Sequence, residues 1–214
     1  DTTGAEVVLG TQFDSANSVV SLNGVYRASQ ADPWVPMAGL ESLGATGLLG
    51  VEKVGNAWVA FGYVKGSAQP GEPPHGAIWT SDDGVVWARV AGDFSGGTLG
   101  SQVTGVCSLP NGAFVGVGSR EVSVGDYRAT VWSPGEAGAW VVRDVSNLAS
   151  VEGEVESCAS DDNGVILSSR LGGREALYRS TDGATWTEAF HAQRGMYMGE
   201  PVAVDGGFVA SGSV

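Results

Sequence analysis

The sequence is poor in positive charge and holds no long hydrophobic run. Eleven lysine and arginine residues stand against 24 aspartates and glutamates, which gives a formal net charge of −13. A field of this sign repels nucleic acid and anionic lipid headgroups, so we expect neither as a partner. No stretch approaches the roughly 18 consecutive apolar residues of a membrane-spanning helix, so the sequence predicts no membrane span.

Cysteine and histidine are also scarce, with two residues of each. No Cys-x-x-Cys occurs and the two histidines are distant from each other, so we expect no zinc site. Nucleophile elbows, phosphate-binding loops and metalloprotease helices are lacking, and Gly116-Val117-Gly118 lies within an expected strand. The sequence therefore predicts no catalytic residue, no metal and no cofactor.

Glycine, by contrast, is abundant, with 34 of the 214 residues and no Gly-X-Y period. This composition is typical of many short strands joined by tight turns, and the chain is long enough to bury a substantial core. No helical period of 3.6 residues extends over a useful length. The richness in Gly, Ala and Val, with two lysines, is typical of a GC-rich bacterial gene.

Aromatic pairs with a spacing of eight residues recur along the chain. Successive pairs begin 53, 53 and 46 residues after one another. A repeat of this length is typical of solenoids and of propeller blades. The four pairs are Tyr26 with Trp34, Trp79 with Trp87, Trp132 with Trp140, and Tyr178 with Trp186.

A second motif lies upstream of each pair: a β-branched residue followed three positions later by Gly or Ser, with a Gly or Asn turn signal just before it. Asn and Gly tolerate the positive φ of tight hairpins, so each copy begins the second arm of a hairpin. The first arms are then 47–54, 103–109, 155–160 and 201–205. The copies are Val7 and Gly10, Val59 and Gly62, Val115 and Gly118, Ile166 and Ser169, and Val209 and Gly212.

Each repeat therefore holds four antiparallel strands in about 50 residues, which is one blade of a β-propeller. The predicted fold is all-β, a single partial propeller with three whole blades and two partial ones. We expect a first blade without its inner strand at 1–46, whole blades at 47–97, 98–150 and 151–197, and the start of a further blade at 198–214. The start at Asp1 indicates a mature secreted product or an excised piece of a propeller with six or seven blades.

The turn between the third and fourth strands carries a motif in two of the blades. These turns read Ser81-Asp82-Asp83-Gly84-Val85-Val86-Trp87 and Ser180-Thr181-Asp182-Gly183-Ala184-Thr185-Trp186. The motif resembles the Asp box, Ser-x-Asp-(x)-Gly-x-x-Trp, of the sialidase-like β-propeller family with BNR repeats. In such a turn a hydroxyl and a carboxylate bond the free amides, Gly supplies the conformation and Trp packs beneath.

The resemblance implies structural roles, because the family carries the motif in enzymes and non-enzymes alike. A lone carboxylate in a turn lacks the several oxygens that Ca²⁺ requires, so Asp83 and Asp182 are not expected metal ligands. Two copies are degraded: Ala28 and Gln30 replace Ser and Asp in the first blade, and Pro134 and Glu136 do so in the third. The structural residues are Ser81, Asp83, Gly84 and Trp87 in one turn and Ser180, Asp182, Gly183 and Trp186 in the other.

Cys107 and Cys158 lie 51 residues apart, near the same point of the inner strand in consecutive blades. We expect a disulfide between the two blades, and two independently buried thiols are the alternative. A disulfide favours an oxidising compartment, so the expected location is extracellular or in the cell envelope.

Propellers bind ligands at one end of the central channel, where loops join the second strand to the third and one blade to the next. Asp-box turns face the other end. This places candidate contacts in 65–76, 119–128, 170–175 and the connection 190–200, unless that connection is only packed by its own side chains. The candidates for contact with a protein or a carbohydrate are His191, Arg194, Tyr197, Arg128, Arg174 and His75.

A sialidase needs three arginines, a Tyr nucleophile with a Glu partner and an Asp acid, and its first arginine lies in Arg-Ile-Pro. The sequence has no Arg-Ile-Pro, and Tyr197 with Glu200 is the one nucleophile pair that we can suggest. The arginines that could join it are Arg120, Arg128, Arg170, Arg174 and Arg194.

We therefore expect a non-enzymatic, secreted or envelope-exposed module that binds or scaffolds a protein or a carbohydrate. The remaining blades, or another subunit, are its further expected partners, since raw sheet edges and exposed apolar faces favour association. The alternatives are a glycoside hydrolase of the sialidase-like propeller class and a structural subunit of an extracellular assembly.

Overall fold

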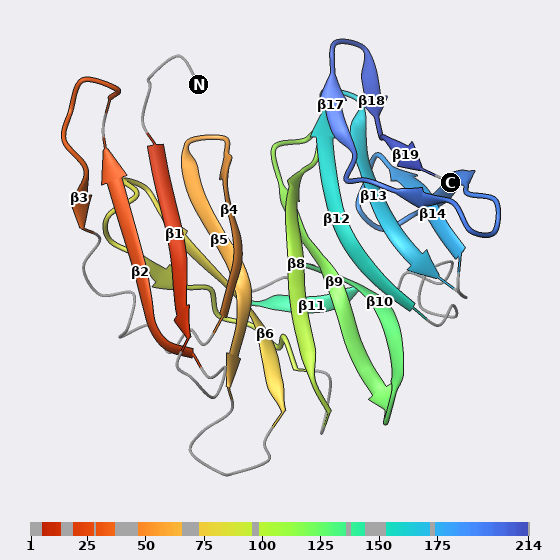
Figure 1. The fold of residues 1–214 in the computed structure, drawn as a ribbon, viewed down its shortest axis with the longest axis horizontal. Helices are drawn as coiled ribbons and strands as arrows, with labels where there is room; N and C mark the ends of the chain where they lie inside the picture. The colour runs from red at the N-terminus through yellow and green to blue at the C-terminus, as the bar shows by residue number, and fades with distance from the viewer. Residues whose placement is uncertain are drawn as a thin grey trace.

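The computed structural model describes residues 6–13, 19–27, 29–36, 47–65, 73–95, 99–135, 138–143, 153–171 and 174–213. These residues form strands and turns and no helix, so none of them belongs to a helix that could cross a membrane. The strands make separate antiparallel sheets that follow one another in sequence order (Figure 1).

Three of the sheets have four strands each, built from four consecutive segments of the chain. The second sheet contains β4 (Gly47–Val54), β5 (Ala57–Lys65), β6 (Pro74–Ser81) and β7 (Ala88–Arg89). The third contains β8 (Ser101–Ser108), β9 (Phe114–Ser123), β10 (Asp126–Pro134) and β11 (Trp140–Arg143). The fourth contains β12 (Gly153–Asp161), β13 (Gly164–Leu171), β14 (Arg174–Ser180) and β15 (Thr187–His191). Each sheet is an up-and-down meander, which is the blade of a β-propeller.

Smaller sheets lie before and after these three blades. The first sheet has three strands, β1 (Glu6–Phe13), β2 (Val19–Arg27) and β3 (Val35–Pro36). After the fourth sheet, β17 (Val202–Val204) pairs with β18 (Gly207–Val209), and β16 (Tyr197–Met198) pairs with β19 (Gly212–Ser213). β18 and β19 lie on the same arm of one long hairpin, interrupted at 210–211, and the Gly199 amide donates to the Ser211 carbonyl (2.9 Å) between the two paired stretches.

The core lies between the sheets, because each face of the second and third sheets packs against a neighbouring sheet. Successive side chains of a strand point to opposite faces. From β5, Ala60 and Val64 join a cluster with the first sheet, whereas Val59 and Phe61 join a cluster with the third. This burial on both faces explains why β5 reads as a nearly continuous apolar run rather than an alternating one.

The first aromatic residue of each repeat marks the same place in the three whole blades. Trp79 lies opposite Ala60, Trp132 opposite Gly116, and Tyr178 opposite Leu167. In every case the partner is the residue that follows the β-branched residue of the second strand. The environments of Trp79, Trp132 and Tyr178 are therefore equivalent.

The first sheet departs from this pattern in two ways. Tyr26 lies opposite Val7 itself, so the Val7 and Gly10 copy is offset by one residue from the copies in the whole blades. Trp34 is 41% exposed, whereas its counterparts Trp87, Trp140 and Trp186 are buried. The guanidinium of Arg27 covers the Trp34 ring at 4.6 Å from the ring centroid.

Backbone contacts connect the second sheet to the third. The Trp140 amide donates to the Ala91 carbonyl (2.8 Å), and the Asp93 amide donates to the Trp140 carbonyl (2.9 Å). Gly92 lies between them in a parallel bridge with Trp140, and a Cβ at Gly92 would lie 2.6 Å from the Trp140 backbone oxygen. A side chain at this position would therefore break the contact between the two blades.

The third and fourth sheets are joined by a covalent bond and a hydrogen bond. Cys107 of β8 and Cys158 of β12 form a disulfide. Three residues earlier on each strand, the Thr104 hydroxyl donates to the Val155 carbonyl (2.8 Å). The inner strands β8 and β12 are thus held side by side (Figure 1).

Candidate functional site

The two Asp-box-like turns lie at one end of the sheets, after β6 and after β14. The Ser81 hydroxyl donates to an Asp83 carboxylate oxygen (3.0 Å) and accepts from the Gly84 amide (2.9 Å). The same carboxylate oxygen accepts from the amides of Val85 and Val86, each at 2.8 Å. Gly84 has a φ of 77°, a conformation that favours glycine. The turn therefore satisfies its own backbone.

The second turn repeats this geometry. Asp182 accepts from the amides of Ala184 (2.8 Å) and Thr185 (2.7 Å), and Ser180 accepts from the amide of Gly183 (2.9 Å). The buried indole of Trp186 donates to the Gly183 carbonyl (3.2 Å), as Trp87 does to Gly84 (3.1 Å). Since these polar groups are occupied within the turn, the geometry supports a structural role for both motifs.

These hydrogen bonds stabilise the charged carboxylates. The amides of Thr185 and Ala184 lower the pKa of Asp182 to about 2, and those of Val86 and Val85 lower the pKa of Asp83. A carboxyl whose pKa is lower in the folded state stabilises the fold above its unfolded pKa, and this contribution is lost as the pH falls through the folded value.

We expect Asp182→Asn to lower the free energy of unfolding by about 1 kcal/mol at pH 6, as the loss of a capping carboxylate does at a helix end. At pH 2, near the folded pKa of Asp182, about half of the wild-type carboxyl groups are protonated, so the difference should shrink. Urea unfolding followed by tryptophan fluorescence at both pH values measures it. Asp82→Asn, an exposed carboxylate in the matching turn, is the control. Equal stability of the Asp182 variant and the wild type at pH 6 would contradict the assignment.

The two degraded copies use other contacts. In the first sheet, the Ser29 hydroxyl donates to Asp32 (2.8 Å) and accepts from the Ala31 amide (3.3 Å). Ser29 and Asp32 therefore form the polar pair of this turn. They lie one position after Ala28 and two positions after Gln30. In the third sheet the turn closes through the backbone, since the Gly135 amide donates to the Ala139 carbonyl (2.8 Å). Ala28 and Glu136 lie outside the described residues.

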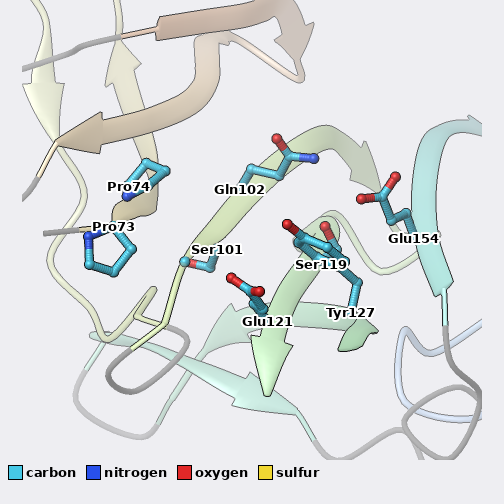
Figure 2. A pocket seen from close by; sticks show the side chains of 9 residues that line it. Pro73, Pro74, Ser101, Gln102, Ser119, Glu121, Tyr127 and Glu154 are labelled. Carbon is cyan, nitrogen blue, oxygen red and sulfur yellow. The ribbon is translucent and has the colours of Figure 1, made fainter. Parts of the chain in front are cut away.

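A pocket of about 270 Å³ lies at the other end of the sheets (Figure 2). It lies over the beginning of β8 and the adjoining ends of β9 and β10, with the start of β6 on one side and β12 on the other. Pro74 begins β6 and Ser81 ends it, so the pocket and the Asp-box-like turn occupy opposite ends of the same strand. Its lining residues are Pro73, Pro74, Gly100, Ser101, Gln102, Ser119, Glu121, Tyr127 and Glu154.

Some of the polar groups in this pocket are fixed by the fold. The Ser101 hydroxyl donates to the Phe94 carbonyl and accepts from the Gly76 amide (2.9 Å). Glu121 accepts from the Gly125 amide (2.6 Å), which connects it to the turn between β9 and β10. Glu154 lies on β12 with an exposed side chain. Glu121 and Glu154 therefore bring two carboxylates to one pocket from different blades.

Ser119 is the exception among these groups. Its side chain is 1% exposed, and its hydroxyl has no hydrogen-bond partner among the described residues. Figure 2 shows Ser119 beside Tyr127, between Ser101 and Glu154. A buried hydroxyl without a partner costs free energy, which a bound ligand could recover.

None of the six contact residues proposed from the sequence lines this pocket. His75 is on β6, and its buried Nδ1 has no partner among the described residues. Arg128 on β10 forms an ion pair with Asp126 (2.9 Å). Arg174 begins β14 with an exposed side chain.

The other three candidates are in the connection after the fourth sheet. His191 ends β15 and contacts Glu188 (2.8 Å). Arg194 is exposed in the turn before β16, and Tyr197 on β16 is 62% exposed. The structure thus separates His191, Arg194 and Tyr197 from the pocket. The pocket is lined instead by parts of the segments 65–76 and 119–128, by residues 100–102 and by Glu154.

Arg170, on β13, forms ion pairs with acidic groups beside the segment that joins β15 to β16. It lies 3.3 Å from Glu156 and 3.2 Å from Glu175. Glu175 is buried and also accepts from the Met198 amide. The connection is therefore held to the fourth sheet by its backbone, and the guanidinium of Arg170 is occupied by two carboxylates of its own blade.

Carboxylates from three segments gather beside the inner strands. Desolvation and the charge of Glu200 raise the pKa of Glu52 to about 7, although water reaches the Glu52 side chain. Desolvation also raises the pKa of Glu156, with a contribution from Glu200. No group of three or more His, Cys, Asp or Glu side chains among the described residues is arranged to hold a metal ion.

No protein-family model and no curated protein matches the chain. Among solved structures, fructan 1-exohydrolase IIa from Cichorium intybus in complex with 1-kestose is 13% identical over 66% of this chain and 31% of its own, with a TM-score of 0.46. YCF48 from Cyanidioschyzon merolae is 13% identical over 85% of this chain and 68% of its own, with a TM-score of 0.34. YCF48 bound to D1 peptide is 14% identical over 80% and 61%, with a TM-score of 0.33. This chain thus spans about a third of the fructan exohydrolase. The blades are identified from the four-stranded sheets of this chain itself.

Proposed function

We propose that the chain is a non-enzymatic β-propeller module that binds a protein or a carbohydrate at the end of the sheets opposite the Asp-box-like turns. The observation that carries this proposal is the pocket of Figure 2, where polar side chains from the third and fourth sheets converge. The buried, unpartnered Ser119 hydroxyl supports a ligand there. The paired turn geometry around Asp83 and Asp182 supports membership of the Asp-box family.

A location outside the cytoplasm belongs to the same proposal. The disulfide between Cys107 and Cys158 supports it, because structural disulfides persist in oxidising compartments. The remaining blades or another subunit are further proposed partners. Exposed valines at the last hairpin, Val202, Val204 and Val209, support contact with such a partner.

The test uses arrays of immobilised peptides and glycans probed with the tagged chain. Gln102→Trp places a large ring in the pocket, and we expect it to reduce binding of a retained ligand at least tenfold. Val86→Trp, an exposed position in an Asp-box-like turn at the opposite end, should bind as the wild type does. Thermal melting establishes that both variants are folded. Failure of the wild type to retain any ligand, or equal retention by Gln102→Trp, would refute the proposal.

A glycoside hydrolase is the second candidate, because Glu121 and Glu154 line one pocket and two carboxylates are what such enzymes require. If the proposed binding function is correct, the chain does not hydrolyse fluorogenic sialosides or β-glucosides. Turnover by the wild type that disappears in Glu154→Gln would replace the binding function by a hydrolase. The pocket lining contains no arginine for the carboxylate of a sialoside, which disfavours the sialidase form of this alternative.

A further inference from the structure

We infer that the pocket of Figure 2 holds the cationic side chain of a lysine or arginine on a partner protein. The inference rests on the proposed binding function and names the chemistry of its ligand. It depends on the charge of the lining, on the unpartnered Ser119 hydroxyl and on the shape of the pocket.

The described lining of the pocket carries two carboxylates and no basic side chain. The carboxylates are those of Glu121 and Glu154. Among the side chains that the structure describes, no basic group forms an ion pair with either carboxylate. Arg128 is bonded to Asp126, and Arg170 to Glu156 and Glu175. Arg120 and His75 neighbour lining residues in the sequence but do not line the pocket, and their charges act on Asp93.

Several undescribed segments contain no basic residue, and the side chain of Lys65, opposite Pro74 in the β5–β6 pairing, lies outside the described part of the structure. The sequence of 66–72, 96–98, 136–137, 144–152 and 172–173 contains no lysine, arginine or histidine. A net charge of −13 adds a long-range field of the same sign. Both the pocket and the whole chain therefore attract a cation and repel an anion.

The lining is rich in hydrogen-bond acceptors. Ser119 offers a buried hydroxyl oxygen without a partner, and Gln102 offers an amide oxygen. An ammonium carries three N–H donors and a guanidinium five. A cationic side chain would thus satisfy Ser119 and both carboxylates together, which a ligand with a single donor could not do.

The apolar part of the lining fits the rest of a long basic side chain. Pro73 and Pro74 form one wall (Figure 2), against which the methylene stem of Lys or Arg can pack. Tyr127 presents an aromatic ring on the other side, suited to a cation–π contact. The volume of about 270 Å³ is below the roughly 300–1,000 Å³ of pockets for drug-sized ligands, so one side chain fits better than an oligosaccharide.

Acetylated and amidated Gly-Arg-Gly is the probe, and the same tripeptide with citrulline is its neutral isostere. Two-dimensional NMR of the ¹⁵N-labelled chain follows the amides of Ser119, Glu121, Tyr127 and Glu154. We expect the arginine peptide to shift these amides saturably, and the citrulline peptide to leave them unchanged. The apparent affinity should fall about three- to tenfold in Glu154→Gln. Raising the salt concentration should weaken it further.

Asp162→Asn is the matched control, because it removes one exposed negative charge at the β12–β13 turn, at the far end of β12 from Glu154. It should bind the arginine peptide as the wild type does. Equal shifts from both peptides, or no loss in Glu154→Gln, would refute a cation site. If maltotriose alone shifts these amides, the cation inference fails while the binding function stands. If the arrays retain no ligand and none of the three probes shifts these amides, both proposals are refuted.

Discussion

Loss of the Cys107–Cys158 disulfide is expected to lower the free energy of unfolding by roughly 4 kcal/mol. The bond joins β8 to β12, and the cysteines are 51 residues apart in the chain. An unfolded chain that is not cross-linked at these points has many more conformations, so the reduced protein gains more entropy on unfolding.

Guanidinium unfolding of the wild type and of the double variant Cys107→Ala/Cys158→Ala measures this effect. Reductant should shift the wild-type midpoint close to that of the double variant, and it should leave the double variant unchanged. The second comparison separates reduction of the disulfide from any other action of the reductant. A reduced wild type as stable as the oxidised one would show that the cross-link contributes little.

Trp132→Ala is expected to lower the free energy of unfolding by about 3–5 kcal/mol, because a large buried ring is replaced by a cavity. Trp132 is fully buried between the second and third sheets, with its ring centroid 6.1 Å from that of Phe94. The variant should remain folded at low temperature if the disulfide is intact, since the third and fourth sheets are then still joined.

The comparison of Trp132→Phe with Trp186→Phe tests the hydrogen-bond part of the same argument. The Trp132 indole N–H has no acceptor among the described residues, whereas that of Trp186 donates to the Gly183 carbonyl. Phenylalanine removes an unsatisfied donor at 132 and a satisfied one at 186. We therefore expect Trp186→Phe to be about 1 kcal/mol more destabilising than Trp132→Phe. Urea unfolding of both variants gives the difference, and the reverse order would contradict the assignment of these bonds.

The repeated corners of the blades could be predicted from the sequence because they depend on local contacts. An aromatic residue on the third strand must meet a small or branched residue on the second, and a Gly or Asn turn fixes the register between them. These conditions hold for Trp79, Trp132 and Tyr178, so spacing alone located the strands. The all-β propeller fold followed from that spacing.

The irregular ends could not be predicted in the same way. The pairing of β16 with β19 joins residues on either side of a hairpin, and no spacing rule of the whole blades covers it. In the first sheet, Val7 and Gly10 match the sequence motif and yet lie one residue out of register. The motif specifies a strand, whereas the partner strand specifies the register.

The pocket was only partly accessible to sequence reasoning. The usual position of ligand-binding loops in propellers predicts the segments 65–76 and 119–128, and these contain Pro73, Ser119 and Glu121 of the pocket lining. Glu154 belongs to an inner strand and comes from the next blade, and the distance between two blades is set by packing of the core. The richest sequence cluster, around Arg194 and Tyr197, lies instead beside β16, away from the pocket.

The backbone bridge at Gly92 has a consequence for the evolution and engineering of such chains. A side chain at Gly92 would meet Trp140, whereas a Cβ at Gly207, the first residue of β18 in the β17–β18 hairpin, would have no atom within 4 Å. Insertions, epitopes or labels should therefore be tolerated at the hairpin and rejected at the bridge, although both segments look like ordinary surface loops. Related chains are expected to keep a constant length around Gly92 and to vary in length around Gly207.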